Sequence, residues 1–434
     1  PQSQQIPPPK PPHQHAENNV IDESFWQASL RGVDGKVAVP LERIARAPWT
    51  GRRERNRADV QGDGAALSWL SERLAEVLAM RNPTPAALRA AGITSERAAF
   101  AKAAWYGEVE DLDITPSMPK SRQQARIEAY RAQECLKLAR LWTLVGEEID
   151  LDRDELRSIR LERGAMASDG HFYDRVTMCW SADLTIADDA HVLMIDADFE
   201  ADIARRFVPE IESGASIEVA RQNLTVTQIV DRAVGKTLIA ATDGDTDNAK
   251  AGRKNVAKLH GFLASEAAKA DNGALLVTYK ATEDELAKLP AIPGAEVAHF
   301  NAIRGIDSWR DVSTLIVAGR TQPDPKTLET IARALYFRDH RSLTYTGTYT
   351  PEIRGIRMDN GDVVAVSVDH HPDTTIDRLL RQIRESELVQ AIDRGRFVHR
   401  AADNPGKVVI LTNTVLPITV HEVTTWDALM PDML

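Results

Sequence analysis

The segment 387–400, ELVQAIDRGRFVHR, contains one glutamine, three arginines and a histidine within fourteen positions. Gln390, Arg394 and Arg396 lie at the end of a helical pattern. The guanidinium group of arginine is planar and always charged, so an arginine in a fixed position can stabilise negative charge that spreads over phosphoryl oxygens. Arginines on a surface helix can also serve solubility alone. The segment is therefore either a phosphate-sensing turn or an ordinary solvated helix end.

Polar residues also follow three apolar, strand-like runs of the sequence. They are Thr278 and Lys280 after GALLV, Asn301, Arg304 and Gly305 after AEVAHF, and Arg320 after STLIVA. Ligands of open α/β sheets bind at the carboxyl ends of the strands, so we expect these residues and the 387–400 segment to line one rim. Each residue alone has a simpler explanation, because every strand must end in something polar.

Strand-like and helix-like runs alternate from about residue 190 onward. The runs GALLVTYK, STLIVAGR and KVVILTNT have the length of buried strands, whereas TTIDRLLRQIRESELVQAIDR shows apolar residues at helical spacing. This alternation indicates an α/β domain with a mostly parallel sheet. Between about residues 63 and 162, apolar residues recur at three- and four-residue spacing, which predicts a helical region.

The composition excludes several classes of protein. The 434 residues carry a net charge of −11, which argues against a general polyanion-coating protein but allows a local basic channel. Cys135 and Cys179 form neither a CxxC pair nor a disulfide framework, which favours a reducing cytoplasm. The longest apolar runs are far below the roughly 20 residues of a membrane span.

Three segments, in this order, resemble the second RecA-like domain of superfamily 2 helicases, and most closely the helicase-like proteins of phages and plasmids. VTYK resembles motif IV, HFNAIRGIDSWRDVSTLIVAGR resembles motif V with the strand after it, and QAIDRGR resembles motif VI. The resemblance implies that Gln390 contacts a nucleotide and that Arg394 and Arg396 act as fingers on its γ-phosphate. It also implies that the motif IV and V residues contact the DNA backbone. Asp393 stands where the family has glycine, and its carboxylate could pair with a finger arginine.

The same resemblance extends to two acidic segments nearer the start of the chain. VIDESFW looks like motif II, in which Asp22 would bind Mg²⁺ through water and Glu23 would orient or deprotonate the attacking water. HVLMIDAD looks like motif III, with Asp196 and Asp198 coupling the two lobes. Both segments have alternatives. The first acidic pair could simply cap a helix, and the second could be a strand end or the metal-binding DxD of a toprim domain.

The phosphate-binding loop GxxxxGK[ST] of motif I does not occur in this sequence. AVGKTLIA contains GKT, but the position that needs the first glycine is Val230. We therefore expect motif I to lie upstream in a longer protein or on a partner chain. The alternative is a degenerate ATPase that has lost motif I and only binds or scaffolds.

The sequence thus predicts an α/β protein of RecA-like parallel-sheet lobes with a large helical insertion. We expect a disordered linker over 1–19, a partial first lobe over 20–59 and 166–212, the insertion over 60–165, and a second lobe over 213–434. The predicted function is that of an ATP-dependent, cytoplasmic helicase or translocase on single-stranded or forked DNA, with ATP and Mg²⁺ as cofactors and no membrane partner. The alternatives are a toprim-like metal-dependent nucleotidyl enzyme and a catalytically inactive DNA-binding or scaffold module.

Overall fold

The chain divides into two compact units in the computed structural model. Unit 1 comprises Pro1–Glu212 and Thr330–Arg341, and unit 2 comprises Ser213–Glu329 and Ser342–Leu434. The structure describes residues 29–31, 33, 37–45, 57–109, 112, 114–115, 117–167, 169–184, 186, 191–194, 199–214, 217, 220–240, 246–303 and 305–430, with the backbone alone at 57–63 and 131–132.

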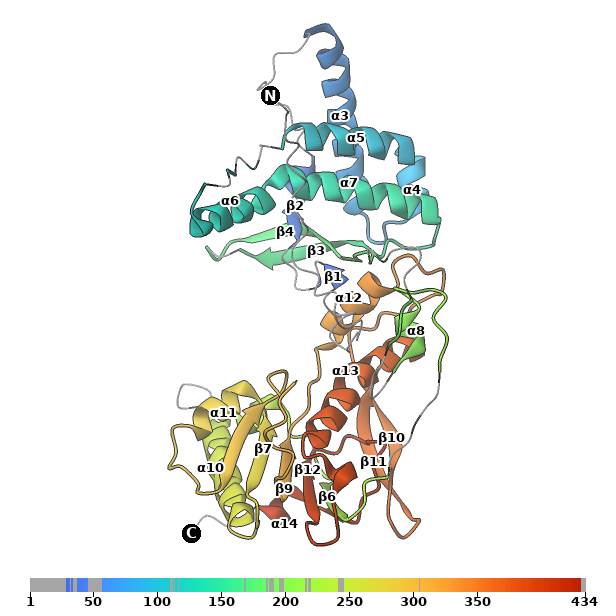
Figure 1. The fold of residues 1–434 in the computed structure, drawn as a ribbon. Coiled ribbons are helices and arrows are strands. Elements are labelled where there is room, and N and C mark those ends of the chain that lie inside the picture. Colours follow the sequence, from blue (N-terminus) through green and yellow to red (C-terminus); the bar gives the residue numbers. More distant parts are fainter. Residues whose placement is uncertain are drawn as a thin grey trace, which may run out of the picture. The chain divides into compact units, whose positions relative to one another are not determined.

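Unit 2 is built around a parallel sheet of six strands (Figure 1). The strands are β6 (Leu224–Ile229), β7 (Ala274–Thr278), β8 (Ala295–His299), β9 (Thr314–Ala318), β12 (Gly406–Leu411) and β13 (Glu422–Thr424). Their order across the sheet is β13-β6-β12-β9-β7-β8, and every adjacent pair is parallel. The carboxyl ends of the strands therefore lie on one edge of the sheet, and their first residues lie on the opposite edge.

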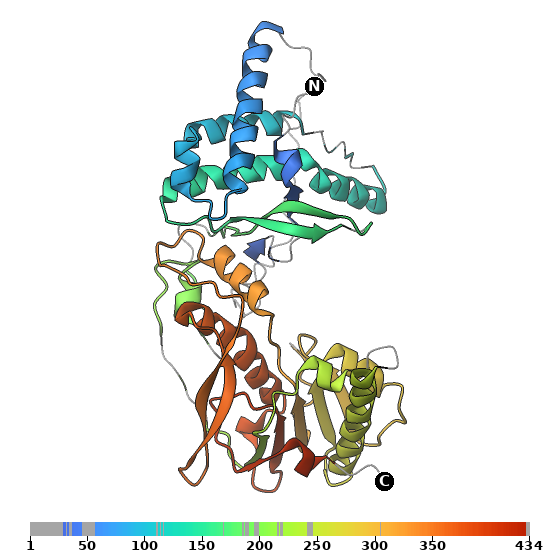
Figure 2. The ribbon, with the colours of Figure 1, turned by 180° about the vertical axis from the view of Figure 1, so that it is seen from behind.

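Successive residues of the central strands pack into separate cores on the two faces of the sheet. Leu275 and Val277 of β7 enter one core and Leu276 enters the other, and the same alternation recurs in β9 and β12. The sequences of these strands are continuous apolar runs because both faces of a parallel sheet are covered. Figures 1 and 2 show α10 and α13 on opposite sides of the sheet.

Different elements close the two cores of unit 2. The first core is closed by α13 (Thr374–Asp393) and by the antiparallel hairpin of β10 (Thr350–Arg357) and β11 (Val363–His370). The second core is closed by α9 (Lys236–Ile239), α10 (Asp247–Ala267), α11 (Lys280–Leu286) and α14 (Trp426–Leu429). A short 3-10 helix, η1 (Phe397–His399), follows α13, and α12 (Pro325–Leu335) follows β9.

Unit 1 combines helices with short antiparallel sheets. Its helices are α2 (Leu41–Ile44), α3 (Arg57–Leu78), α4 (Pro85–Ala90), α5 (Ser95–Gly107), α6 (Lys120–Ala132), α7 (Glu134–Leu151) and α8 (Ala201–Ala204). One sheet has the order β2-β4-β3, with β2 (Ala38–Pro40), β3 (Ile159–Met166) and β4 (Phe172–Met178), and β1 (Leu30–Arg31) pairs with β5 (Trp180–Ser181). Leu74 of α3, Trp105 of α5 and Trp142 of α7 share one core.

A buried carboxylate organises the place where a late part of the chain joins unit 1. Glu148 of α7 is fully buried and accepts a hydrogen bond from the backbone N–H of Arg157 (2.8 Å). The guanidinium group of Arg157 in turn donates to the carbonyl oxygens of Tyr336 (3.0 Å) and Asp339 (2.8 Å). Buried charged groups are costly unless their hydrogen bonds are satisfied, so these contacts anchor Thr330–Arg341 in unit 1.

The expected α/β class with a parallel sheet is confirmed in unit 2, and the sheet is consistent with a RecA-like architecture. Helices α3 to α7 occupy most of the range expected to be helical, but its last part is strand β3. The described strands within 20–59 and 166–212 pair antiparallel. These pairs are not part of a parallel RecA-like sheet, and the partial first lobe expected over these ranges remains a prediction. Among the described residues, no helix has the length and apolarity needed to cross a membrane.

We expect Gly319→Ala to lower the free energy of unfolding by about 2–4 kcal/mol. Gly319 has a φ of +103°, and a Cβ there would lie 2.5 Å from the ring of Tyr279, whose hydroxyl group is held by hydrogen bonds. Urea denaturation of the full chain measures the effect. Gly214→Ala is the control, because its Cβ would meet nothing within 4 Å. Equal stability of the two variants would contradict this close approach.

We also expect acid to destabilise unit 2 through Glu266 of α10. Burial alone would raise the pKa of Glu266, but hydrogen bonds from Lys407 and Lys269 outweigh burial and lower the pKa below its ordinary value. A carboxylate with a lowered folded-state pKa stabilises the fold above its unfolded pKa, and that stability is lost as the pH falls through the folded pKa. Urea denaturation from neutral pH to about pH 3 tests this. Glu266→Gln should have a shallower pH dependence, and an unchanged dependence would refute the assignment.

Candidate functional site

Five residues singled out in the sequence lie outside the described residues: Asp22, Glu23, Asp196, Asp198 and Arg304. The expected Mg²⁺ ligand and the expected coupling residues therefore stay predictions. Within the described ranges, no three His, Cys, Asp or Glu side chains gather so that they could hold a metal ion. The other candidates all belong to unit 2, where the sheet distributes them between its two edges.

Two motif IV-like candidates lie at the carboxyl end of β7 in contrasting surroundings. Thr278 is fully buried, and its hydroxyl group makes no hydrogen bond to any described residue. Lys280 is exposed and pairs with Asp284 (2.9 Å) and Glu283 (2.8 Å). The hydrogen bond to Asp284, together with that to Glu283, raises the pKa of Lys280. Lys280 can therefore reach an outside anion only by leaving these carboxylates.

Asn301 and Gly305 shape the loop of residues 300–303 and 305–313 that follows β8. Both have positive φ angles, +68° at Asn301 and +73° at Gly305. The backbone N–H of Asn301 donates to the carboxylate of Glu387 on α13 (2.9 Å), and its side chain remains exposed. The loop thereby turns back from the carboxyl edge toward the first residue of β9.

Arg320 is fixed at the carboxyl edge by its main chain and by its side chain. Its N–H donates to the hydroxyl oxygen of Tyr279 (2.9 Å), and that hydroxyl group donates to the carbonyl oxygen of Arg320 (3.0 Å). Its guanidinium group donates to Asp369 (2.7 Å). Burial and the neighbouring Arg384 lower the pKa of Arg320, and Asp369 opposes them. Arg320 is thus already engaged by a protein carboxylate.

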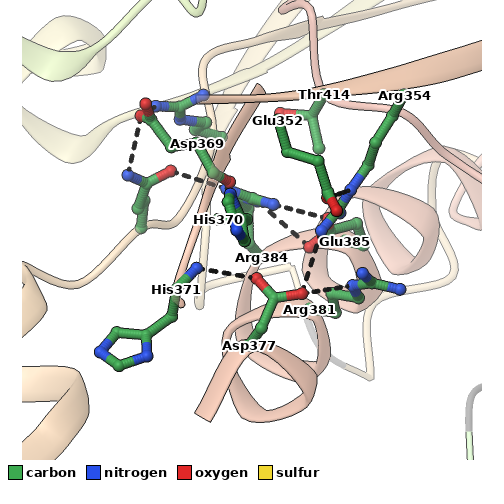
Figure 3. A network of polar contacts seen from close by, with 12 residues as sticks. Glu352, Arg354, Asp369, His370, His371, Asp377, Arg381, Arg384, Glu385 and Thr414 are labelled. Atoms are coloured by element: carbon green, nitrogen blue, oxygen red, sulfur yellow. Dashed lines mark hydrogen bonds and ion pairs between the residues drawn. The ribbon is translucent and has the colours of Figure 1, made fainter. Parts of the chain in front are cut away.

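Asp369 belongs to a network of polar groups around the buried Arg384 of α13 (Figure 3). Arg384 is fully buried and donates to Glu385 (2.7 and 3.1 Å). It also donates to the carbonyl oxygen of Asp369 (2.8 Å) and to the side chain of Gln322 (3.1 Å). The network therefore connects β11, α13 and the loop after β9.

Arg354 of β10 extends this network along α13 (Figure 3). It donates to Asp377 (3.0 Å) and lies 3.4 Å from Glu385. Asp377 also accepts a hydrogen bond from Arg381 (2.9 Å). Each buried guanidinium group faces a carboxylate, so the charges balance, and the hairpin, α13 and the segment after β9 are held together at the carboxyl edge.

The turn after α13 reaches the opposite edge of the sheet. Arg400 is 6% exposed and donates to the carbonyl oxygens of Val312 (2.5 Å) and Gly395 (3.0 Å), just before β9 begins. The backbone carbonyl oxygen of Arg400 accepts from Asn223, which precedes β6 (2.8 Å). The expectation of one shared rim is therefore wrong for the 387–400 segment, because α13 runs back against the direction of the strands.

Phe397 explains the glycine of this turn. Its ring is fully buried against Gly395 and against Gly406, the first residue of β12. A Cβ on Gly395 would lie 2.3 Å from the ring, and one on Gly406 would lie 2.4 Å from it. Gly395 stands between Arg394 and Arg396 because only glycine leaves room for the ring of Phe397.

Arg396 joins the motif VI-like turn to the motif V-like loop. Its Nε donates to Asp307 (2.9 Å), 89 positions away, and both side chains are about half exposed. A cavity of about 290 Å³ lies at this contact, lined by Asp307, Arg310, Asp311, Arg396, His399, Arg400 and Asn404. Cationic side chains outnumber the two carboxylates of the lining, so the cavity suits an anion.

Asp393 does not pair with a finger arginine. Its carboxylate accepts hydrogen bonds of 2.8 to 3.0 Å from Arg221, which precedes β6. Arg394 is half-buried at the end of α13, and Gln390 is half-buried one turn earlier. Asp393, which departs from the motif VI pattern, is thus neutralised by Arg221. Arg396 pairs with Asp307 instead.

Sequence reasoning missed three arginines of this edge: Arg221, Arg310 and Arg400. Arg400 belongs to the 387–400 segment, but nothing in the segment distinguishes a buried arginine from an exposed one. Arg310 lies inside the motif V-like segment but was not singled out there, and no local pattern marks Arg221 as a partner of Asp393.

No family model matches the chain, and no curated protein matches it. Among solved structures, the chain is similar to an XPD helicase with 9% sequence identity and a TM-score of 0.34. The similarity covers 91% of this chain and 64% of that one, so the chain spans less than two thirds of that protein's length. A similarity of this size carries no argument about activity.

We expect Arg400→Ala to lower the free energy of unfolding by about 2–4 kcal/mol, because it leaves buried carbonyl groups without donors. Arg396→Ala removes a half-exposed side chain of the same turn and should change stability by less than about 0.5 kcal/mol. Urea denaturation of both variants measures the difference. Similar losses in the two would show that Arg400 does not anchor this edge.

Proposed function

We propose that this chain acts as an ATP-dependent DNA helicase or translocase of the phage and plasmid type. The observation that carries the proposal is the contact between Arg396 and Asp307, which joins the segments resembling motifs VI and V around one cavity. In this proposal the terminal phosphate of ATP enters that cavity, with Gln390 and Arg394 beside it.

The charges of the cavity support this role. Arg310 and Arg396 are exposed enough to move without disturbing a core, whereas Arg400 is held by carbonyl groups. A phosphate would compete with Asp307 for Arg396, and a charged acceptor of this kind forms strong hydrogen bonds with guanidinium groups. Arginine fingers of phosphoryl-transfer enzymes are worth about 10³–10⁵ in rate.

The remaining parts of the proposal rest on the sequence. They are Asp22 and Glu23 with Mg²⁺, Asp196 and Asp198 in coupling the lobes, and Thr278, Lys280, Asn301, Arg304, Gly305 and Arg320 in binding single-stranded or forked DNA. The phosphate-binding loop would come from an upstream segment or a partner chain, and the protein would act in the cytoplasm.

The test is ATP hydrolysis with Mg²⁺, with and without single-stranded DNA, by the chain supplied with its phosphate-binding loop. We expect DNA-stimulated hydrolysis that Glu23→Gln abolishes. Arg396→Ala and Arg394→Ala should each lower kcat by at least about 100-fold. Arg378→Ala, an exposed arginine of the same helix, is the matched control and should keep full activity.

Two results would reject the proposal. One is the absence of DNA-stimulated hydrolysis although the supplied loop binds ATP. The other is unchanged kcat in both Arg394→Ala and Arg396→Ala.

A further inference from the structure

Unit 1 contains a second cavity with an excess of positive charge, of about 710 Å³. It lies between the segment after α3, the segment before β3, and β3 itself, which is an edge strand of its sheet. Its charged lining consists of Arg81, Arg160, Arg163 and Arg333 against Asp154 and Glu155.

The protein leaves much of this charge uncompensated. The guanidinium groups of Arg81 and Arg160 make no hydrogen bond or ion pair with any other described residue. Arg163 donates to the carbonyl oxygen of Ala79 (2.6 Å) and only weakly to a carboxylate, that of Asp174 (3.5 Å). Carbonyl partners orient a guanidinium group but leave its net charge in place.

The two carboxylates of the lining are outnumbered by its four arginines. Glu155 accepts a hydrogen bond from Arg157 (2.8 Å), which does not line the cavity. Asp154 is exposed. By contrast, the buried guanidinium groups of Arg153 and Arg384 face carboxylates directly, those of Glu148 and Glu385. Like charges gathered at one site repel one another, and an anionic ligand would relieve that repulsion.

The main chain around the cavity is well supported. The carbonyl oxygen of Arg160 accepts a hydrogen bond from Thr177 of β4 (3.2 Å), its partner across the sheet. Thr84 caps α4 through its hydroxyl group, which accepts from the N–H of Ala87 (3.1 Å). The arginines therefore project from fixed backbone positions, which reduces the entropy lost when a ligand binds.

We propose that this cavity binds a phosphate-bearing ligand of nucleotide size, either a free nucleotide or one unit of a nucleic acid strand. The arginines recognise the phosphate. Met80, Pro83, Leu156, Ile159 and Leu161 supply an apolar wall for a sugar or a base. The volume falls within the roughly 300–1,000 Å³ of small-molecule sites. The inference goes beyond the proposed function, because it concerns unit 1 and uses no helicase-like motif.

The test measures binding to the full chain in two arms. One arm titrates a fluorescent single-stranded oligothymidylate by anisotropy, and the other titrates ATP and tripolyphosphate by calorimetry. The variant Arg81→Ala/Arg160→Ala should weaken the arm that uses this cavity by at least about tenfold, since two charge-assisted contacts are lost. Arg205→Ala, an exposed arginine elsewhere in unit 1, is the matched control and should bind normally.

The two arms identify the source of the phosphate. A loss confined to the oligonucleotide arm assigns the site to nucleic acid, and the slope of log affinity against log salt should then fall by about 1.4. A loss in the ATP or tripolyphosphate arm assigns it to a free nucleotide. The melting temperature and circular dichroism of the double variant should match those of the control. Binding of both ligands that is unchanged in a correctly folded double variant, or absent in the parent chain, overturns the proposal.

Discussion

All strands of the unit 2 sheet run in the same direction, so every helix that connects them must run back. A strand of five or six residues spans about 17–20 Å, and a helix of twenty residues is about 30 Å long. Helix α13 therefore presents its early residues at the carboxyl edge and its last residues at the opposite edge. Arg384 contacts Asp369 at the first edge, and the turn with Arg396 and Arg400 closes the second. The parallel order of the strands thus fixes the edge of the sheet at which Arg384, Arg396 and Arg400 lie.

The arginines of this protein fall into two physical classes. Three arginines are buried and donate hydrogen bonds to carbonyl groups or carboxylates of the fold: Arg157, Arg384 and Arg400. Each joins segments that are distant in the sequence, and removing one partner would leave a buried polar group unsatisfied. Arg396 and Arg160 retain charge that a ligand can use. The residue type alone does not show which class an arginine belongs to, because both classes use the same set of guanidinium N–H donors.

The sequence allowed the sheet to be predicted but not its polar contacts. Strands β7, β9 and β12 are buried on both faces, and their continuous apolar runs made them visible. Strand β10 was not predicted because TPEIRGIR mixes polar and apolar residues on both of its sides. The pairing of Asp393 with Arg221 joins residues 172 positions apart, and no local pattern encodes such a contact. Arg394 and Arg396 were singled out in the sequence, whereas the cavity beside Arg396 depends on the loop that follows β8.

The segment Thr330–Arg341 gives the architecture a property of its own. It belongs to unit 1 although unit 2 precedes and follows it in sequence, and Arg157 grips its carbonyl groups. The chain therefore passes between the units three times, and no single cut in the polypeptide yields both units intact. If recombination at one point replaced Pro1–Glu212 with a homologous sequence, the segment Thr330–Arg341 would still come from the original gene. Phe337 and the carbonyl partners of Arg157 would then face a unit 1 that they do not match. The two sequence segments of unit 1, Pro1–Glu212 and Thr330–Arg341, are thus constrained to change together.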